Sequence, residues 1–128
     1  MRGQYHFRSS PRGLLAWDVH RLVALSRGLE RESVPLANIR ELDEVYWSND
    51  GAGMTCRQVV DHARLMEEAD LAHPVILSSD GRVMDGMHRI CKALLLGHES
   101  IEAVRFRVDP EPDYVGVHPD ELPYVDSE

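Results

Sequence analysis

A hairpin that runs directly into a helix is the feature that most constrains how this chain folds. Residues 74–77 (Pro-Val-Ile-Leu) are a short apolar run typical of a buried strand, and Ser79-Asp80-Gly81 predicts a turn. Residues 82–84 predict a second short strand. A helix is predicted from about Gly86, almost directly after this second strand, and Gly97 is expected to end it. Strands that pass straight into a helix indicate a mixed fold in which helices cover a small sheet.

Two further helices are predicted before this hairpin. The first begins at Ser10-Pro11, because Ser caps helices and Pro suits their first turn. Gly28 is expected to end this helix. Its apolar residues recur at helical spacing; these are Leu15, Val19, Leu22, Leu25 and Leu29. The second begins at Thr55-Cys56-Arg57-Gln58, which fits a capping box, and runs to about Asp70.

Two strands and a loop complete the expected order. Residues 33–39 predict a short extended segment that Pro35 confines to a sheet edge or a strand start. Residues 40–54 are expected to form a loop, since they contain Asn49-Asp50-Gly51-Ala52-Gly53. Residues 102–108 alternate as a half-buried strand does. The order helix, strand, helix, hairpin, helix, strand predicts an α+β fold.

The charge and composition of the chain argue against a DNA-binding protein, a membrane protein and a disulfide-linked secreted protein. The 128 residues carry a formal net charge of −8, but residues 109–128 contain seven acidic residues and no Lys or Arg. The remainder is close to neutral, so direct DNA binding is not expected. The chain contains no apolar run near the roughly 20 residues that cross a bilayer, and residues 1–12 do not resemble a signal peptide. Two cysteines, Cys56 and Cys91, are too few for a disulfide framework, so we expect a cytoplasmic protein without membrane contact.

The turn Asp85-Gly86-Met87-His88-Arg89 is the best candidate for a binding site. A helix N-terminus leaves backbone amides unpaired and carries partial positive charge, and Gly lets a ligand approach the backbone. Arg89 and His88 add donors suited to phosphate oxygens. The alternative is purely structural: Asp85 caps the helix, Gly86 turns the chain, and His88-Arg89 form a solvated face.

Residues 33–108 resemble the ParB/sulfiredoxin superfamily. The similarity rests on four pieces and on Gly97; they are Val34-Pro35-Leu36-Ala37-Asn38-Ile39, the helix after Thr55, His73-Pro74-Val75-Ile76-Leu77, and Val83-Met84-Asp85-Gly86-Met87-His88-Arg89-Ile90-Cys91-Lys92-Ala93-Leu94. The resemblance implies a ParB/sulfiredoxin-like α+β fold that binds a nucleotide through the turn. Residues 1–32 are then an N-terminal helical extension, and residues 109–128 are an acidic, Pro-rich tail.

The residues of the turn separate the branches of this superfamily. Sulfiredoxins place a catalytic cysteine where this chain has Met87, and a thioether cannot act as a thiolate. Chromosome-partition ParB proteins add a helix-turn-helix domain that binds DNA. We expect that the acidic 20-residue tail is too short to form such a domain. The turn is most similar to the Asp-Gly-His-His-Arg branch, which includes ADP-dependent free serine kinases.

That branch implies a catalytic acid shortly after the first strand, where Glu44 is the first candidate and Asp43 the second. It also implies that Arg57 reaches the nucleotide, which would be ATP, ADP or CTP, and it is compatible with Mg²⁺ near Asp85. The alternative for Glu41, Asp43 and Glu44 is an ordinary acidic loop, and Arg57 is equally compatible with a solvated position. Phosphoryl transfer needs a group that orients the attacking hydroxyl and cations that hold the phosphates.

Three classes of function remain open from the sequence. The first is a nucleotide-dependent phosphotransferase acting on a small-molecule acceptor. The second is a nucleotide-binding regulatory module without chemistry, and the third is an interaction domain that docks on a protein partner or forms a homodimer. The seven histidines show no zinc-like spacing and are not expected to cluster. Trp47 or Tyr46, in the loop near Glu44, is a candidate to cover a bound base.

Overall fold

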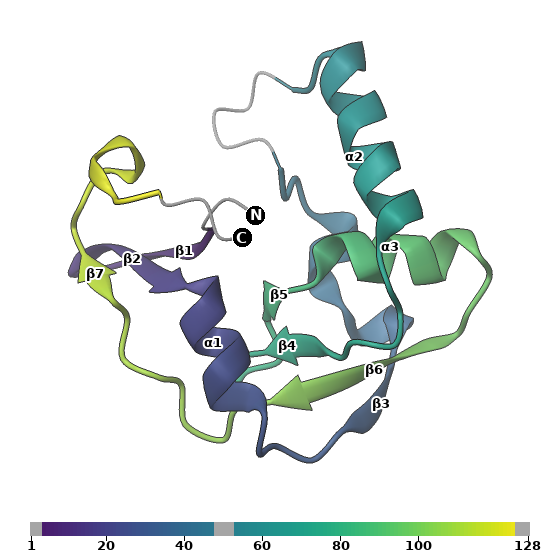
Figure 1. The fold of residues 1–128 in the computed structure, drawn as a ribbon, viewed down its shortest axis with the longest axis horizontal. Helices are drawn as coiled ribbons and strands as arrows, with labels where there is room; N and C mark the ends of the chain where they lie inside the picture. The colour runs from purple at the N-terminus through teal and green to yellow at the C-terminus, as the bar shows by residue number, and fades with distance from the viewer. Residues whose placement is uncertain (1–3, 48–52, 125–128) are drawn as a thin grey trace.

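The computed structural model describes residues 4–47 and 53–124 and has an α+β fold with two small sheets (Figure 1). The first sheet has the order β1-β2-β7 and the second has the order β3-β6-β4-β5. Their strands are β1 (Tyr5–Ser10), β2 (Gly13–Asp18), β3 (Glu32–Pro35), β4 (Val75–Leu77), β5 (Val83–Asp85), β6 (Ser100–Arg105) and β7 (Tyr114–Val115). The helices are α1 (Val19–Ser26), α2 (Cys56–Glu68) and α3 (Met87–Leu95), with short 3₁₀ turns at Leu36–Asn38, Arg40–Asp43 and Pro119–Glu121.

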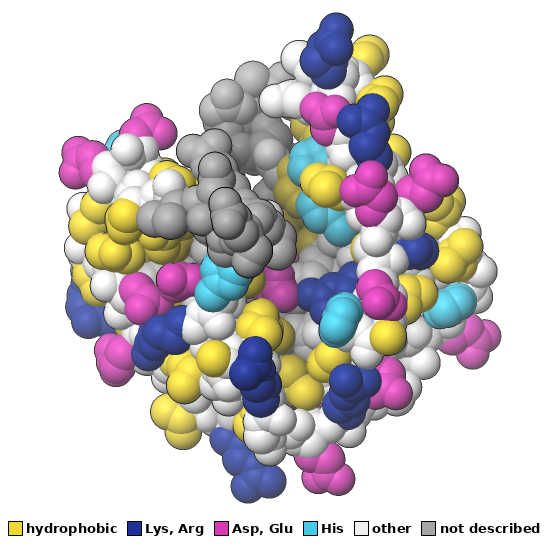
Figure 2. Space-filling view, viewed as in Figure 1, with side chains coloured by type: hydrophobic (Ala, Val, Ile, Leu, Met, Phe, Trp, Pro, Cys, Tyr) yellow, Lys and Arg dark blue, Asp and Glu magenta, His cyan; other side chains and the backbone are white. Residues whose placement is uncertain are grey.

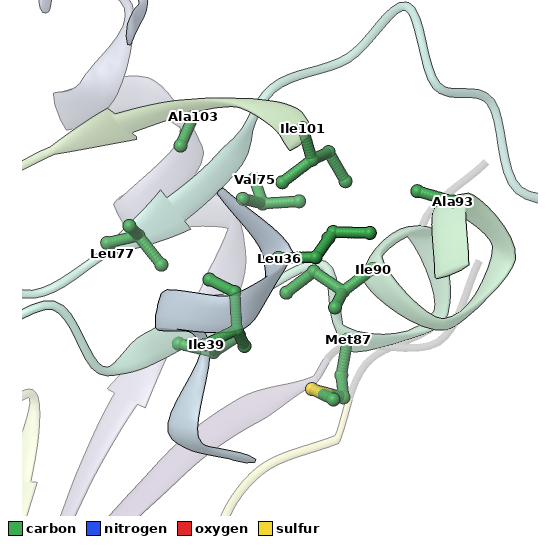
Figure 3. Packing of buried hydrophobic residues seen from close by; sticks show 10 residues of the cluster. Leu36, Ile39, Val75, Leu77, Met87, Ile90, Ala93, Ile101 and Ala103 are labelled. Atoms are coloured by element: carbon green, nitrogen blue, oxygen red, sulfur yellow. The ribbon is translucent and has the colours of Figure 1, made fainter. Parts of the chain in front are cut away.

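The second sheet is mixed, and its strands β4 and β5 are buried on both faces. Strands β4 and β6 are parallel, whereas β3 pairs with β6 and β5 pairs with β4 in antiparallel orientation. Val75 and Leu77 face α3 and the turn Leu36–Asn38, where they pack with Ile90 and Ile101 (Figure 3). Ile76, between them, faces the opposite side and packs with α1 and β2. Burial on both sides explains why residues 75–77 form an unbroken apolar run.

The N-terminal segment differs from the predicted long helix. Residues 5–18 form an antiparallel hairpin, and the helix begins only at Val19, where the Asp18 side chain accepts a hydrogen bond from the His20 amide. The helical spacing that begins at Leu15 therefore spans a strand and a helix, and the prediction of a helix from Ser10 is wrong. The turn signal lay in Pro11-Arg12-Gly13: Gly13 has φ +106°, and its carbonyl accepts a hydrogen bond from Ser10 Oγ at 2.7 Å.

The later elements agree more closely with the sequence. The Thr55 capping box is complete, with both reciprocal hydrogen bonds present, and helix α3 ends just before Gly97. Part of the predicted loop over residues 40–54 forms the 3₁₀ turn Arg40–Asp43, while residues 48–52 lie outside the described residues. Across the described ranges, no helix is long and apolar enough to cross a membrane.

The described part of the acidic tail is held against the N-terminal hairpin. Strand β7 pairs with β2, and the Trp17 indole donates a hydrogen bond to the Pro110 carbonyl at 2.8 Å. Asp113 Oδ2 accepts hydrogen bonds from the Asp18 amide at 2.8 Å and from Arg21 at 3.2 Å. The acidic side chains of this segment therefore include structural acceptors, and Leu122 is buried. Residues 125–128 lie outside the described residues.

Candidate functional site

The Asp85–Arg89 turn joins β5 to α3 through one residue. Gly86 occupies the N-cap position of α3 with φ +107°, and no side chain caps this helix within the described part of the chain. A Cβ at Gly86 would lie 2.6 Å from Val75 Cγ1 and 3.0 Å from Arg89 Nη2. Glycine is therefore required because the backbone is left-handed and packs tightly on β4. The sequence had suggested instead that glycine admits a ligand.

Arg89 fastens the turn to the sheet. Its Nη2 donates to Asp85 Oδ2 at 2.8 Å, and its Nη1 donates to the carbonyls of His73 at 3.0 Å and Pro74 at 2.8 Å. The Arg89 side chain is only 16% exposed. These bonds use three of the five guanidinium donors, so Arg89 positions the turn and keeps little capacity for a ligand.

Met87 contributes to the site only through its backbone. Its side chain is buried in the same core cluster as Ile90 and Ala93 from helix α3 (Figure 3). A methionine fills an irregular core space well and offers no donor. The amide of Met87, at the start of α3, is the group it can present to an anion.

His88 belongs to a cluster that the sequence analysis missed. His62 Nδ1 lies 2.8 Å from His88 Nε2, so one ring donates and the other accepts. Trp47 stacks on both rings, with centroid distances of 4.2 Å to His62 and 4.7 Å to His88. The expectation that the histidines do not cluster is wrong for His62 and His88, because α2 packs on α3 and brings together these residues, 26 positions apart.

Burial favours the neutral form of both imidazoles near pH 7. Burial lowers the pKa of His88, and the neighbouring His62 lowers the pKa further. Burial also lowers the pKa of His62, which Asp61 partly offsets. Two neutral rings share a hydrogen bond without repulsion, whereas two cations would not. His88 is therefore a neutral donor or acceptor beside the turn.

A basic cavity of about 630 Å³ lies on one side of the turn. It is lined by Asp85, Gly86, His88 and Arg89 from the turn and by Arg27, Arg31 and His73, which lie just after α1 and just before β3 and β4. A second carboxylate, Asp70, and several apolar side chains complete its wall. Arg31 donates to the Ala72 carbonyl at 3.1 Å, whereas Arg27 is exposed. Near the centre of the face in Figure 2, basic and histidine side chains lie around a hollow together with acidic and apolar ones.

An aromatic cavity of about 700 Å³ lies on the other side of the turn. It shares the residues 85–88 with the basic cavity and adds aromatic side chains from three separate segments; they are Tyr5, Phe7, Tyr46, Trp47 and Tyr124. Burial raises the pKa of Tyr46 to about 12, with the charges of Glu41 and Asp85 adding to the effect. The phenol is thus a neutral hydrogen-bonding group at physiological pH.

The expected catalytic acids lie apart from the basic cavity. Glu44 Oε2 is 2.7 Å from Arg82 Nη1, and Glu44 lines two other cavities, of which one also reaches the buried Met87. Asp43 is exposed and lines none of these cavities. Arg57 is exposed in the first turn of α2 and also lines none of them. The structure therefore places none of these three predicted residues in the basic or the aromatic cavity.

The magnesium prediction rests on Asp85. Within residues 4–47 and 53–124, no group of three or more His, Cys, Asp or Glu residues comes together to hold a metal ion. Asp85 is a single carboxylate, and one of its oxygens already accepts a hydrogen bond from Arg89. This arrangement does not form a site in which the protein alone holds Mg²⁺, although magnesium is often carried by phosphates with few protein ligands.

Comparison with known proteins produced no match: no family model matches this chain, and neither a curated protein nor a solved structure matches it.

Proposed function

We propose that this protein binds a mononucleotide across the Asp85–Arg89 turn. The observation that carries the proposal is that residues 85–88 line both the basic and the aromatic cavity. A nucleotide has the same division, with charged phosphates at one end and an aromatic base at the other. The similarity of the turn to the ParB/sulfiredoxin superfamily, taken from the sequence, points to the same ligand class.

The phosphates would occupy the basic cavity. The first amides of α3 and the partial positive charge of its N-terminus favour an anion there. Arg27 and Arg31 supply positive charge from the opposite wall. In this arrangement Arg89 is a positioning residue, since its hydrogen bonds hold the turn to β4.

The base would occupy the aromatic cavity. Trp47 is held by its stacking on His62 and His88, and an ordered aromatic ring loses little freedom when a base packs on it. Tyr5 is also fixed, because it packs edge-on against Tyr124 at a centroid distance of 5.2 Å. Stacking of this kind accepts any base, so the proposal covers ATP, ADP and CTP alike.

The proposal is for binding, and phosphoryl transfer stays a prediction from the sequence. A kinase needs an acid or base beside the transferred phosphate, yet Glu44 is paired with Arg82 and Asp85 is paired with Arg89. A nucleotide-binding module without chemistry agrees better with these ion pairs. A cytoplasmic location and a homodimer or protein partner are likewise predictions from the sequence.

Calorimetric titration with ATP, ADP and CTP, with and without Mg²⁺, tests the proposal. Arg27→Gln should weaken binding about tenfold, because it removes one charge from the basic cavity. Arg57→Gln is the matched control, since Arg57 carries the same charge on the surface and lines neither cavity. Glu44→Gln should leave binding unchanged. Absence of binding for all three nucleotides at millimolar concentration, or equal weakening by Arg27→Gln and Arg57→Gln, would refute the proposal.

A further inference from the structure

A hydrogen bond between two histidines lies beside the turn. His62 Nδ1 is 2.8 Å from His88 Nε2, and the two ring planes are inclined by only 20° with their centroids 5.1 Å apart. Rings stacked face to face would keep their nearest atoms about 3.5 Å or more apart. The two imidazoles therefore meet edge to edge in nearly one plane, which is a favourable geometry for a hydrogen bond between ring nitrogens.

Trp47 holds both imidazoles in this plane. Its indole stacks on His62 at a centroid distance of 4.2 Å and on His88 at 4.7 Å, with the ring planes inclined by 22° and 15°. Neither imidazole can rotate without losing this contact and the hydrogen bond to the other ring. The pair is therefore preorganised, so little freedom is lost when a ligand bonds to it.

The shared hydrogen bond couples the protonation of the two rings. Burial favours the neutral form of both, and a neutral imidazole has one N–H and one bare nitrogen. If His62 Nδ1 donates, the hydrogen of His88 must sit on Nδ1. If His88 Nε2 donates instead, His88 Nδ1 is bare. The direction of this one hydrogen bond therefore decides whether His88 offers a donor or an acceptor at Nδ1.

Nδ1 is the atom through which His88 can bond to a ligand. His88 lines both the basic and the aromatic cavity, and its Nε2 is engaged by His62. Its Nδ1 makes no hydrogen bond to the described residues and is accessible to solvent. The other side chains of the turn offer less, because Asp85 and Arg89 bond to each other and Met87 is buried. His88 Nδ1 and the first amides of α3 are thus the main groups with which the turn can bond to a ligand.

We propose that His62 is a positioning residue that makes His88 a hydrogen-bond donor to phosphate. In the complex, His62 Nδ1–H donates to His88 Nε2, and His88 Nδ1–H donates to a phosphate oxygen, which as an anion accepts and does not donate. Starting from the opposite direction of the bond, His88 Nδ1 takes up one proton from solvent, the bridging proton passes to His62, and His62 Nε2 releases one proton, so the net charge is unchanged. This inference rests on the proposed nucleotide binding, and His62 lines neither cavity.

Nitrogen-15 magnetic resonance of the two imidazole rings tests the proposal, because protonated and bare ring nitrogens have well-separated chemical shifts. In the complex with ADP, and equally with pyrophosphate as a probe that has no base, Nδ1 of both rings should carry the proton and Nε2 of both rings should be bare. Adenosine is the matched control ligand because it lacks the phosphates, and it should not change the populations found in the protein alone. A purely structural role of His62 would not tie ring protonation to phosphate.

Two variants and one control variant complete the test. His62→Phe keeps a ring for Trp47 to stack on but removes the hydrogen bond to His88, and it should weaken ADP binding about tenfold because the bond from His88 to a charged phosphate is no longer supported. His62→Gln retains a donor and an acceptor, so it should recover most of the affinity. His98→Phe is the matched control and should have no effect, since His98 is exposed and lines neither cavity.

The outcomes separate this proposal from the proposed function. If the unmodified protein binds none of ATP, ADP, CTP and pyrophosphate, both are overturned. If it binds ADP but His88 Nδ1 is bare in the complex, only the role of His62 is overturned. Unchanged affinity in a natively folded His62→Phe variant, or equal weakening by His62→Phe and His62→Gln, overturns that role as well. If His62→Phe does not fold, the nitrogen-15 spectra of the unmodified complex decide alone.

Discussion

Gly86→Ala should destabilise this protein much more than glycine replacement at a comparable turn. A non-glycine residue in a left-handed conformation costs about 1–2 kcal/mol, and Gly86 has φ +107°. The new Cβ would also lie 2.6 Å from Val75 Cγ1, and Val75 is fully buried, so it has no space into which to move. Overpacking of this kind adds about 1–3 kcal/mol. The total expected loss is about 2–5 kcal/mol.

The corresponding change in melting temperature follows from the size of the chain. An unfolding entropy of about 2.1 cal/mol/K per residue gives a shift of about 4 °C for each kcal/mol in a chain of 128 residues. Gly86→Ala should therefore lower the melting temperature by about 8–20 °C. Calorimetric or circular-dichroism melting curves measure this shift, and urea denaturation gives the free energy of unfolding independently.

Gly81→Ala is the matched control. Gly81 also has a positive φ, of +82°, but a Cβ there would meet nothing within 4 Å. It should lower the melting temperature by only about 4–8 °C, because the contact contribution is missing. Combining Gly86→Ala with Val75→Ala removes the clashing methyl group, so the double variant should lose less stability than the two single losses added together. Equal losses for Gly86→Ala and Gly81→Ala would refute the argument that β4 packing requires glycine.

Two further predictions concern the N-terminal hairpin and the acidic segment. Because the pKa of His6 falls from 6.5 to about 4 on folding, the unfolded chain binds a proton that the folded chain excludes between these pH values. The free energy of unfolding should therefore fall by up to about 3 kcal/mol as the pH drops from 6.5 to 4. In melting experiments at several pH values, His6→Gln should flatten this part of the plot of stability against pH. An unchanged slope would contradict the assignment to His6. Asp113→Ala should lower the free energy of unfolding by about 1–2 kcal/mol, because the Asp18 amide and Arg21 lose their shared acceptor. Glu111→Ala removes the same charge from an exposed side chain and should change stability by less than about 0.5 kcal/mol in urea denaturation, so equal losses would mean that net charge alone is responsible.

Local signals predicted the central elements of the fold. The capping box at Thr55 specifies its helix start through hydrogen bonds between residues three positions apart. The β4–β5 hairpin and α3 follow equally from adjacent residues, because a short turn and an apolar repeat determine them. These elements form where the deciding interactions are close together in the sequence.

Long-range pairing explains what the sequence did not reveal. Leu15 lies in a strand because it pairs with Arg8 across the hairpin and with Val115 from the C-terminal segment. The turn signal at Pro11-Arg12-Gly13 was the one local sign of this hairpin, and the helical spacing of the apolar residues concealed it. Similarly, the contact between His62 and His88 depends on how α2 packs on α3. The aromatic cavity joins side chains of β1, of the segment after the 3₁₀ turn Arg40–Asp43 and of the C-terminal segment, so its residues show no common spacing.

The pairing of β7 with β2 has a consequence for how the chain folds during synthesis. The Trp17 indole finds its partner at Pro110, which is 93 residues further along the chain. At a synthesis rate of about 5–20 residues per second, the hairpin waits about 5–20 s for that segment. Until then, β2 presents an open edge, and a two-stranded hairpin is only marginally stable by itself. The N-terminal sheet should therefore be completed last, although its first two strands are synthesised before every other element.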